Sequence, residues 1–197
     1  MVTYSFSFLF PLLSVTWGVQ SLLEHFTKRW NPGTRAFFAL VTALICVAIP
    51  LEGLPLARWL TSVNAIFSIP LTALVFDRIW ERSAGYPLMD EKARKATWLF
   101  GLGAGVLLYP MALGLGGFDP YGLGFGSAWL LLPLLLITLF LLHGRNRFGA
   151  VLVASVLAYN LRLLESSNLW DYLLDPLFVV SAAIHHSTSW KEKIRTR

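Results

Sequence analysis

Charged residues are scarce in this sequence. Of its 197 residues only 14% are Asp, Glu, Lys or Arg, whereas an ordinary soluble domain carries about 25%. Hydrophobic residues make up 56% of the chain and aromatic residues 14%, and the mean hydropathy is +0.62. A soluble fold of this length has too much surface for its volume to hide so many apolar side chains. The composition excludes disordered, collagen-like and disulfide-rich proteins, and it predicts a helical membrane protein that crosses the bilayer several times.

Cysteine and recognisable catalytic motifs are nearly absent too. The single cysteine, Cys46, lies in an apolar run, so no disulfide forms within the chain and we expect a small buried hydrophobe. The chain has no HExxH, GxSxG, phosphate-loop or CxxC pattern, so no standard enzyme class is indicated. We expect no cofactor. We attribute the formal net charge of +5 to membrane topology rather than to nucleic-acid binding.

Seven apolar segments are predicted to be membrane-spanning helices, because a spanning helix needs about 20 mostly apolar residues. The segments run over Tyr4–Leu23, Ala36–Leu51, Trp59–Phe76, Trp98–Phe118, Ala128–Leu142, Phe148–Leu164 and Leu169–Ile184. The N-terminus lacks the basic region of a cleaved signal peptide, so the first segment is expected to remain. The predicted fold class is an all-α integral membrane protein, a compact bundle of seven transmembrane helices.

The basic residues predict the orientation of this bundle. In the seven-span topology 14 of the 16 Lys and Arg residues fall on one side, and only Arg58 and Arg162 fall on the other. Because basic loops stay in the cytoplasm, the N-terminus is expected outside and the C-terminus in the cytoplasm. Residues 1–190 then form one transmembrane domain, and residues 191–197 form a basic tail that contacts anionic lipid headgroups. Short loops and the lack of an Asn-x-Ser/Thr acceptor favour the cytoplasmic (inner) membrane of a bacterium.

Polar residues on the expected outer side form the candidate functional site. A helix beginning near Asn168 places Asn168, Asp171, Tyr172 and Asp175 on one stripe, with Asp175 roughly 10 Å below the helix start. An ionisable group at that depth usually faces a bundle interior or a wet cavity. The candidate catalytic residues are therefore Asp175, Asp171 and Glu165, acting as a general base or as ligands to a divalent ion.

The candidate substrate-binding residues are the polar groups around this stripe: Arg162, Asn168, Asp119, Tyr121, Glu52 and Arg58. In a functional site Arg162 binds an anionic head group. In a purely structural interpretation Arg162 pairs with Asp175, Asn168 caps a helix, and Asp171 suits the helix dipole. The sequence leaves both interpretations open.

Two further patterns concern histidine and glycine. The four histidines, His25, His143, His185 and His186, fall at the expected cytoplasmic ends of helices. They are weak candidates for a metal site, since no ligand spacing supports one and histidine is tolerated at an interface. Gly101 and Gly105 form a small-xxx-small pair, which predicts close packing of their helix against a neighbour.

Three functions are consistent with these patterns. The first is a non-catalytic accessory or assembly subunit of a membrane complex, which lies in the lipid bilayer and holds a partner subunit by its apolar and aromatic faces. The second is a membrane enzyme that acts on a lipid-linked or amphiphilic substrate at the outer (periplasmic) face through the Asp/Glu/Arg cluster. The third is a small carrier coupled to a proton or a solute.

Overall fold

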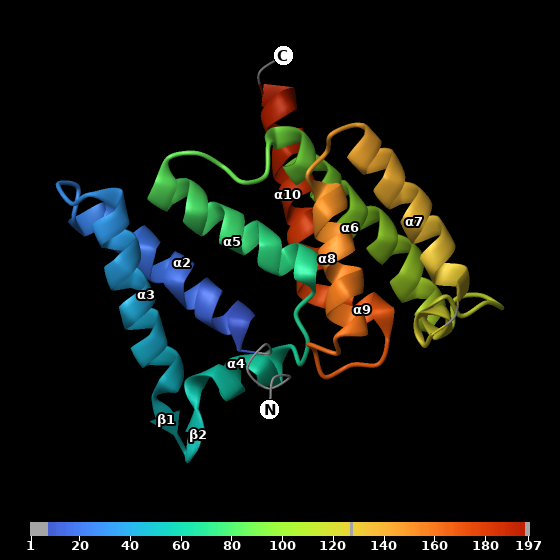
Figure 1. Ribbon diagram of the computed structural model, residues 1–197, viewed down its shortest axis with the longest axis horizontal. Coiled ribbons are helices and arrows are strands. Elements are labelled where there is room, and N and C mark those ends of the chain that lie inside the picture. Colours follow the sequence, from blue (N-terminus) through green and yellow to red (C-terminus); the bar gives the residue numbers. More distant parts are fainter. Residues whose placement is uncertain (1–7, 127, 196–197) are drawn as a thin grey trace.

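The chain is mostly helical in the computed structural model, which describes residues 8–126 and 128–195. The helices are α2 (Leu9–Phe26), α3 (Pro32–Ala48), α4 (Leu56–Val63), α5 (Ile69–Ala84), α6 (Glu91–Ala112), η1 (Tyr121–Gly124, a 3-10 helix), α7 (Ala128–His143), α8 (Phe148–Asn160), α9 (Leu169–Leu173) and α10 (Pro176–Arg195). The strands β1 (Pro50–Leu51) and β2 (Leu54–Pro55) form a small antiparallel hairpin. In Figure 1, α2, α3 and α5 lie at one end of the molecule, and α6, α7, α8 and α10 lie at the other.

The predicted bundle of seven transmembrane helices is wrong. No helix in residues 8–126 and 128–195 is both long enough and apolar enough to cross a membrane. Helices α7 and α8 are strongly apolar but have 16 and 13 residues, so they reach about 24 and 20 Å against the roughly 30 Å of a hydrocarbon core. Helices α6 and α10 are longer but carry charged residues at one end. The same finding contradicts the predicted multi-pass localisation in a bacterial cytoplasmic membrane.

Breaks within the apolar runs explain part of this difference. The predicted segment 59–76 is divided, because α4 ends at Val63 and α5 begins at Ile69. The segment 169–184 is divided at Asp175, since Pro176 begins α10 and a residue before proline is disfavoured in a helix. Residues 191–195 of the expected basic tail belong to α10, which continues to Arg195; residues 196 and 197 lie outside the described residues.

The glycines of α6 permit its close packing against α10, as predicted. A Cβ atom at Gly101 would lie 2.7 Å from Phe178 Cζ, and one at Gly105 would lie 2.5 Å from Val179 Cγ2. Both distances are too short for real contacts, so the helices can approach this closely only where α6 has no side chain. Phe178 itself is fully buried in the core.

Cys46 on α3 is only half-buried, so the expectation that it is a buried hydrophobe is wrong.

A buried ion network joins α5 to the start of α6. Asp77 has an exposed fraction of 1%, and its carboxylate accepts hydrogen bonds from the Met89 backbone N–H (2.7 Å) and from Arg94 Nε (2.6 Å). Arg94 Nη2 also donates to Glu81 Oε2 at 2.6 Å. We call Asp77, Glu81 and Arg94 the ion network. Because Arg94 of α6 binds both carboxylates of α5, the network holds these two helices together.

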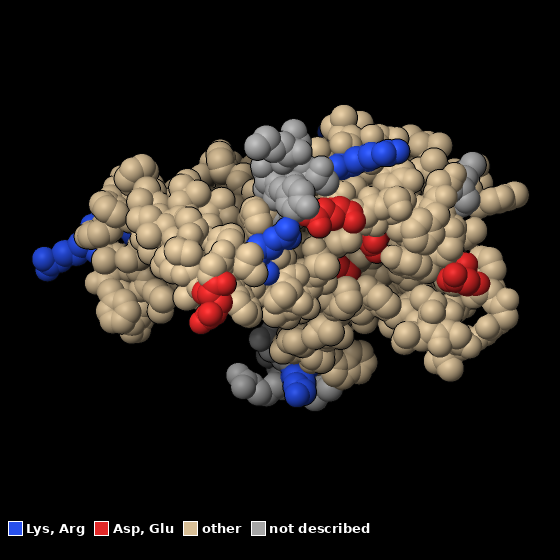
Figure 2. Space-filling view, turned by 90° about the horizontal axis from the view of Figure 1, so that it is seen from below, with Lys and Arg blue, Asp and Glu red and all other residues tan. Residues whose placement is uncertain are grey.

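The surface of the molecule exposes many large apolar side chains. On the face shown in Figure 2, charged side chains are few, and apart from a small group near the centre they are isolated among uncharged residues. Helix α7 is the extreme case, with Trp129 and Phe140 exposed by 77% and 78%. An apolar surface of this kind commonly marks a site of interaction.

Candidate functional site

A cavity of about 420 Å³ opens where four parts of the fold meet. They are the segment after α4, the C-terminal half of α6, η1, and the break between α9 and α10. The polar and aromatic side chains that line it are Asn64, Tyr109, Tyr121, Trp170, Asp171 and Asp175. We call this space the acidic cavity. Its walls also include apolar groups such as Leu108 and Leu174.

Asp175 lies at the break between α9 and α10 and is 3% exposed. Its Oδ1 accepts hydrogen bonds from the backbone N–H of Phe178 (3.0 Å) and from Asn64 Nδ2 (3.2 Å), and its Oδ2 accepts from the backbone N–H of Ser68 (2.9 Å). The bond to Phe178 is a helix N-cap, and the other two attach α10 to the segment between α4 and α5. All three donors are neutral.

Asp171 lies in the single turn of α9 and is half-buried. Its carboxylate accepts hydrogen bonds from the Tyr121 hydroxyl, at 3.0 and 3.2 Å to its two oxygens, and from the Ser166 hydroxyl. These donors are neutral too. In the described residues, no ion pair joins a basic side chain to Asp171 or Asp175.

The two tyrosines of the acidic cavity respond to this environment. Burial, together with the negative charge of Asp171, raises the pKa of Tyr121 to about 12. Burial also raises the pKa of Tyr109, and the charges of Asp175 and Asp171 raise it further. Both phenols therefore stay protonated at neutral pH, and their rings are uncharged aromatic surfaces beside two carboxylates.

Asn168 and Trp170 hold η1 against α9. Asn168 is fully buried, accepts a hydrogen bond from the Trp170 backbone N–H at 2.9 Å and donates from Nδ2 to the Tyr121 carbonyl at 3.0 Å. Trp170 Nε1 donates to the Pro120 carbonyl at 2.9 Å. A Cβ atom at Gly124 would lie 1.7 Å from Asn168 Oδ1, so this position needs glycine. Asn168 is thus a helix cap and a support, as its structural interpretation predicts, and not a residue that lines the cavity.

Arg162 and Glu165 do not join the acidic cavity. Both side chains are exposed, and the predicted ion pair between Arg162 and Asp175 is absent from the described residues, because Asp175 binds Asn64 and two backbone N–H groups instead. Arg162 has φ = 51°, a left-handed conformation that ends helix α8. The Asp/Glu/Arg cluster predicted from the sequence is therefore not assembled.

Three further candidates lie outside the cavity. Glu52 is at the exposed tip of the β1–β2 hairpin, where φ = 51° at Glu52 and φ = 78° at Gly53 form a tight turn. The Arg58 guanidinium lies 5.9 Å from the centre of the Phe8 ring. Asp119 is exposed and accepts a hydrogen bond from the Tyr121 backbone N–H at 2.9 Å, which stabilises the turn before η1.

The four histidines are not gathered at one site among the described residues, although the ring centres of His185 and His186 lie 5.8 Å apart. In residues 8–126 and 128–195, no group of three or more His, Cys, Asp or Glu side chains is placed to hold a metal ion. His25 lies in the last turn of α2, and His143 is the last residue of α7. His185 stacks on Trp98 with ring centres 5.0 Å apart, and His186 follows it on α10.

An apolar groove of about 600 Å³ lies beside the acidic cavity, between α6 and α7. Its lining includes Leu99, Gly103, Leu107, Met111 and Ile137, with no charged side chain among the residues that line it. Leu108 and Trp170 line both spaces. The apolar groove and the acidic cavity therefore lie on two sides of the same wall.

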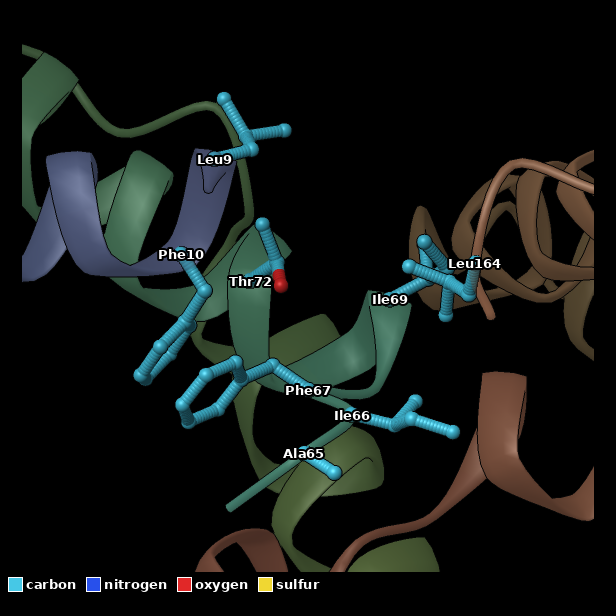
Figure 3. Close-up of a pocket in the computed structure, with 8 residues that line it drawn as sticks. All are labelled: Leu9, Phe10, Ala65, Ile66, Phe67, Ile69, Thr72 and Leu164. Atoms are coloured by element: carbon cyan, nitrogen blue, oxygen red, sulfur yellow. The ribbon is translucent and has the colours of Figure 1, made fainter. Parts of the chain in front are cut away.

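The small cavity in Figure 3 is not a candidate site. It holds about 10 Å³ and is lined by apolar groups, with Thr72 as its one hydroxyl. Phe10 and Phe67 stack at its edge with ring centres 4.1 Å apart. A space of this size admits one water molecule at most.

Sequence reasoning missed three of the six polar and aromatic residues that line the acidic cavity. Tyr109 and Trp170 were both assigned to predicted spans, and Asn64 was inside a third. Asn64 carried a usable signal, because an amide within an apolar run needs a hydrogen-bond partner. Its partner is Asp175, which the sequence did identify.

No known protein family matches this sequence. No curated protein and no solved structure matches the chain either. The interpretation of the site therefore depends on its geometry and chemistry.

Proposed function

We propose that this protein binds an amphiphilic molecule, with the apolar chain of the ligand in the apolar groove and its polar head in the acidic cavity. The observation that carries the proposal is the shared wall: Trp170 and Leu108 line both spaces. A ligand with one apolar and one polar part matches two adjoining spaces of opposite character. The proposal retains the amphiphilic ligand of the second function predicted from the sequence, and makes no use of a membrane.

The apolar groove suits a chain of methylene groups. Its volume of about 600 Å³ is within the usual range for ligand sites. Leu99 and Leu107, which line it, are exposed by 63% and 64%. Each methylene group removed from water contributes about 0.8 kcal/mol of favourable free energy, so full burial of an eight-carbon chain contributes about 6 kcal/mol.

The acidic cavity supplies polar contacts at the end of such a chain. The Tyr109 hydroxyl has no hydrogen-bond partner in the described residues, and Tyr109 lines the cavity. Asp171 lines it as well, with its carboxylate held in place by Tyr121 and Ser166. Rigid polar groups at one end of an apolar space are the usual arrangement of a small-molecule site.

Gly103 offers a clean test of the groove. It lines the groove, and a Cβ atom added there has no neighbour within 4 Å. Gly103→Leu therefore extends a side chain from α6 into the groove, starting from a Cβ atom with open space around it, and leucine is a better helix former than glycine by about 1 kcal/mol. We expect Gly103→Leu to bind octan-1-ol at least about tenfold more weakly than wild type in isothermal titration calorimetry, with an unchanged or higher melting temperature.

The matched control is Gly18→Leu. Gly18 is also in a helix with open space around its Cβ position, but it lines a separate groove beside α2 and α5. This control should bind octan-1-ol as wild type does. Wild-type affinity in Gly103→Leu, or an equal loss in both variants, would contradict the proposal.

The predicted assembly role is a second candidate, favoured by the exposed surface of α7. Trp129, Leu132, Leu136 and Phe140 are each exposed by 61% or more and lie outside the apolar groove. This surface has no charge to oppose pairing with α7 of another copy. Self-association in sedimentation velocity that Leu136→Glu abolishes would favour this role, and a wild-type monomer at high concentration would contradict it.

A further inference from the structure

We infer that the head group bound in the acidic cavity is an organic ammonium cation carried on an alkyl chain. The inference rests on the proposed function and names the class of its ligand. It reverses the head-group charge expected from the sequence, where Arg162 was assigned to bind an anion. The three observations behind it are the uncompensated carboxylates, the aromatic walls and the absence of a basic residue from the lining.

The charge of the two carboxylates is not matched within the cavity. Asp175 accepts from two backbone N–H groups and one amide, and Asp171 accepts from two hydroxyls. These donors satisfy hydrogen-bonding capacity but leave both negative charges in place. No Lys, Arg or His is among the residues that line the space. A ligand cation supplies the missing charge, whereas an anion meets repulsion from both carboxylates.

The aromatic walls are the second observation, and they are independent of the first. The rings of Tyr109, Tyr121 and Trp170 line the same cavity. The face of an aromatic ring attracts cations, and sets of such rings are a general means of binding quaternary ammonium groups. A carboxylate among several aromatic rings favours an ammonium group over a neutral hydroxyl because both kinds of wall attract positive charge.

The ligand's geometry follows from the adjoining groove. Trp170 and Leu108 line both the acidic cavity and the apolar groove, so we place the chain attached to the ammonium group beside these two side chains, along α6. An inorganic cation has no part that occupies the groove. The ligand class is therefore an alkylammonium amphiphile.

The test compares three probes that share an eight-carbon chain and differ in head-group charge: octyltrimethylammonium, octan-1-ol and octanoate. Titration calorimetry on the full chain, with each probe below its micelle concentration, should give the tightest binding for octyltrimethylammonium, by about tenfold over octan-1-ol, and the weakest for octanoate. Equal binding of the cation and the alcohol would overturn the inference while leaving the proposed function intact. Unchanged octan-1-ol binding by Gly103→Leu would instead contradict the proposed function.

Two pairs of variants identify the groups responsible. Asp171→Asn keeps the shape and removes the charge, and it should reduce octyltrimethylammonium binding about tenfold, a larger loss than it causes in octan-1-ol binding. Its control, Glu165→Gln, removes an equal charge from an exposed side chain outside the cavity and should change neither. Tyr109→Phe keeps the ring and should retain cation binding, whereas Tyr109→Leu should weaken it. An Asp171→Asn variant that keeps its preference for the cation, or an equal loss in Glu165→Gln, would overturn the inference.

Discussion

Two groups of carboxylates in this protein have opposite electrostatic surroundings. In the ion network, Asp77 and Glu81 share the guanidinium of Arg94 at 2.6 Å from each. In the acidic cavity, Asp171 and Asp175 accept hydrogen bonds from neutral donors alone. The first group is compensated within the chain, so its role is structural. The second keeps its negative charge beside an open space, so a cation from outside can complete it.

The largest effect is expected where the compensating cation is removed. Arg94→Met leaves Asp77 buried with the Met89 N–H as its remaining donor. Breaking a buried pair in this way costs several kcal/mol; because Arg94 is 16% exposed, we expect a loss of about 3 kcal/mol in the free energy of unfolding, measured by urea denaturation. The control is Lys95→Met, which breaks the exposed pair with Glu91 and should give no measurable change. Similar losses in both variants would mean that the ion network is not a structural feature of the core.

A smaller effect is expected at the carboxylates of the acidic cavity. Asp175→Asn replaces an acceptor oxygen by an amide that faces a backbone N–H, so one buried bond is lost at a cost of about 1–3 kcal/mol in the free energy of unfolding. Asp171→Asn should cost less than about 1 kcal/mol, because the Tyr121 and Ser166 hydroxyls can rotate to donate or accept. Urea denaturation of both variants checks the order. A larger loss in Asp171→Asn would show that Asp171, rather than Asp175, fastens this part of the fold.

The sequence predicted the helical class and three of the cavity's residues, Tyr121, Asp171 and Asp175. Asp171 and Asp175 could be predicted because a carboxylate in an apolar chain is costly and has to be placed near polar groups; Tyr121 was identified as one of the polar groups expected around them. The packing of Gly101 and Gly105 could be predicted for a similar local reason, since small residues four apart form one face of a helix. Predictions of this kind use only the residue and its near neighbours.

The number of helices and the other residues of the cavity could not be predicted, because they depend on where each helix ends, and composition does not reveal that. Each of the divided segments was treated as one helix because its residues are apolar, although Pro176 marks a break. Arg162 ends helix α8 in a left-handed conformation that no residue type there indicates, so its distance from Asp175 was not predictable. Tyr109 was missed because an aromatic residue inside an apolar run resembles a core residue until the opposing wall of the cavity is known.

The smallest effect concerns the later part of α10, the helix that Asp175 caps. Burial lowers the pKa of His185, and the nearby charges of His186 and Arg78 lower it further. The pKa of His185 in the folded state is therefore below its unfolded value of about 6.5. Neutral His185 thus stabilises the fold relative to the protonated form: this contribution to the free energy of unfolding is complete above a pH of about 6.5 and is lost as the pH falls through the folded pKa. Between pH 7.5 and pH 5 the melting temperature of His185→Gln should fall less than that of wild type.

The control for this prediction is His143→Gln, which changes an exposed histidine at the end of α7. It should follow the wild-type curve. If His185→Gln and wild type lose stability in parallel, His185 does not contribute to the pH dependence.

The most direct test of the contrast between the two groups removes one negative charge from each. Asp171→Asn changes the acidic cavity, and Glu81→Gln changes the ion network. Octyltrimethylammonium should raise the melting temperature of wild type, since a ligand that binds the folded state stabilises it. We predict the same rise in the melting temperature of Glu81→Gln, whatever its melting temperature without the probe, and little or no rise in that of Asp171→Asn. A full rise in Asp171→Asn, or its loss in Glu81→Gln, would contradict the conclusion that the acidic cavity alone is open to an external cation.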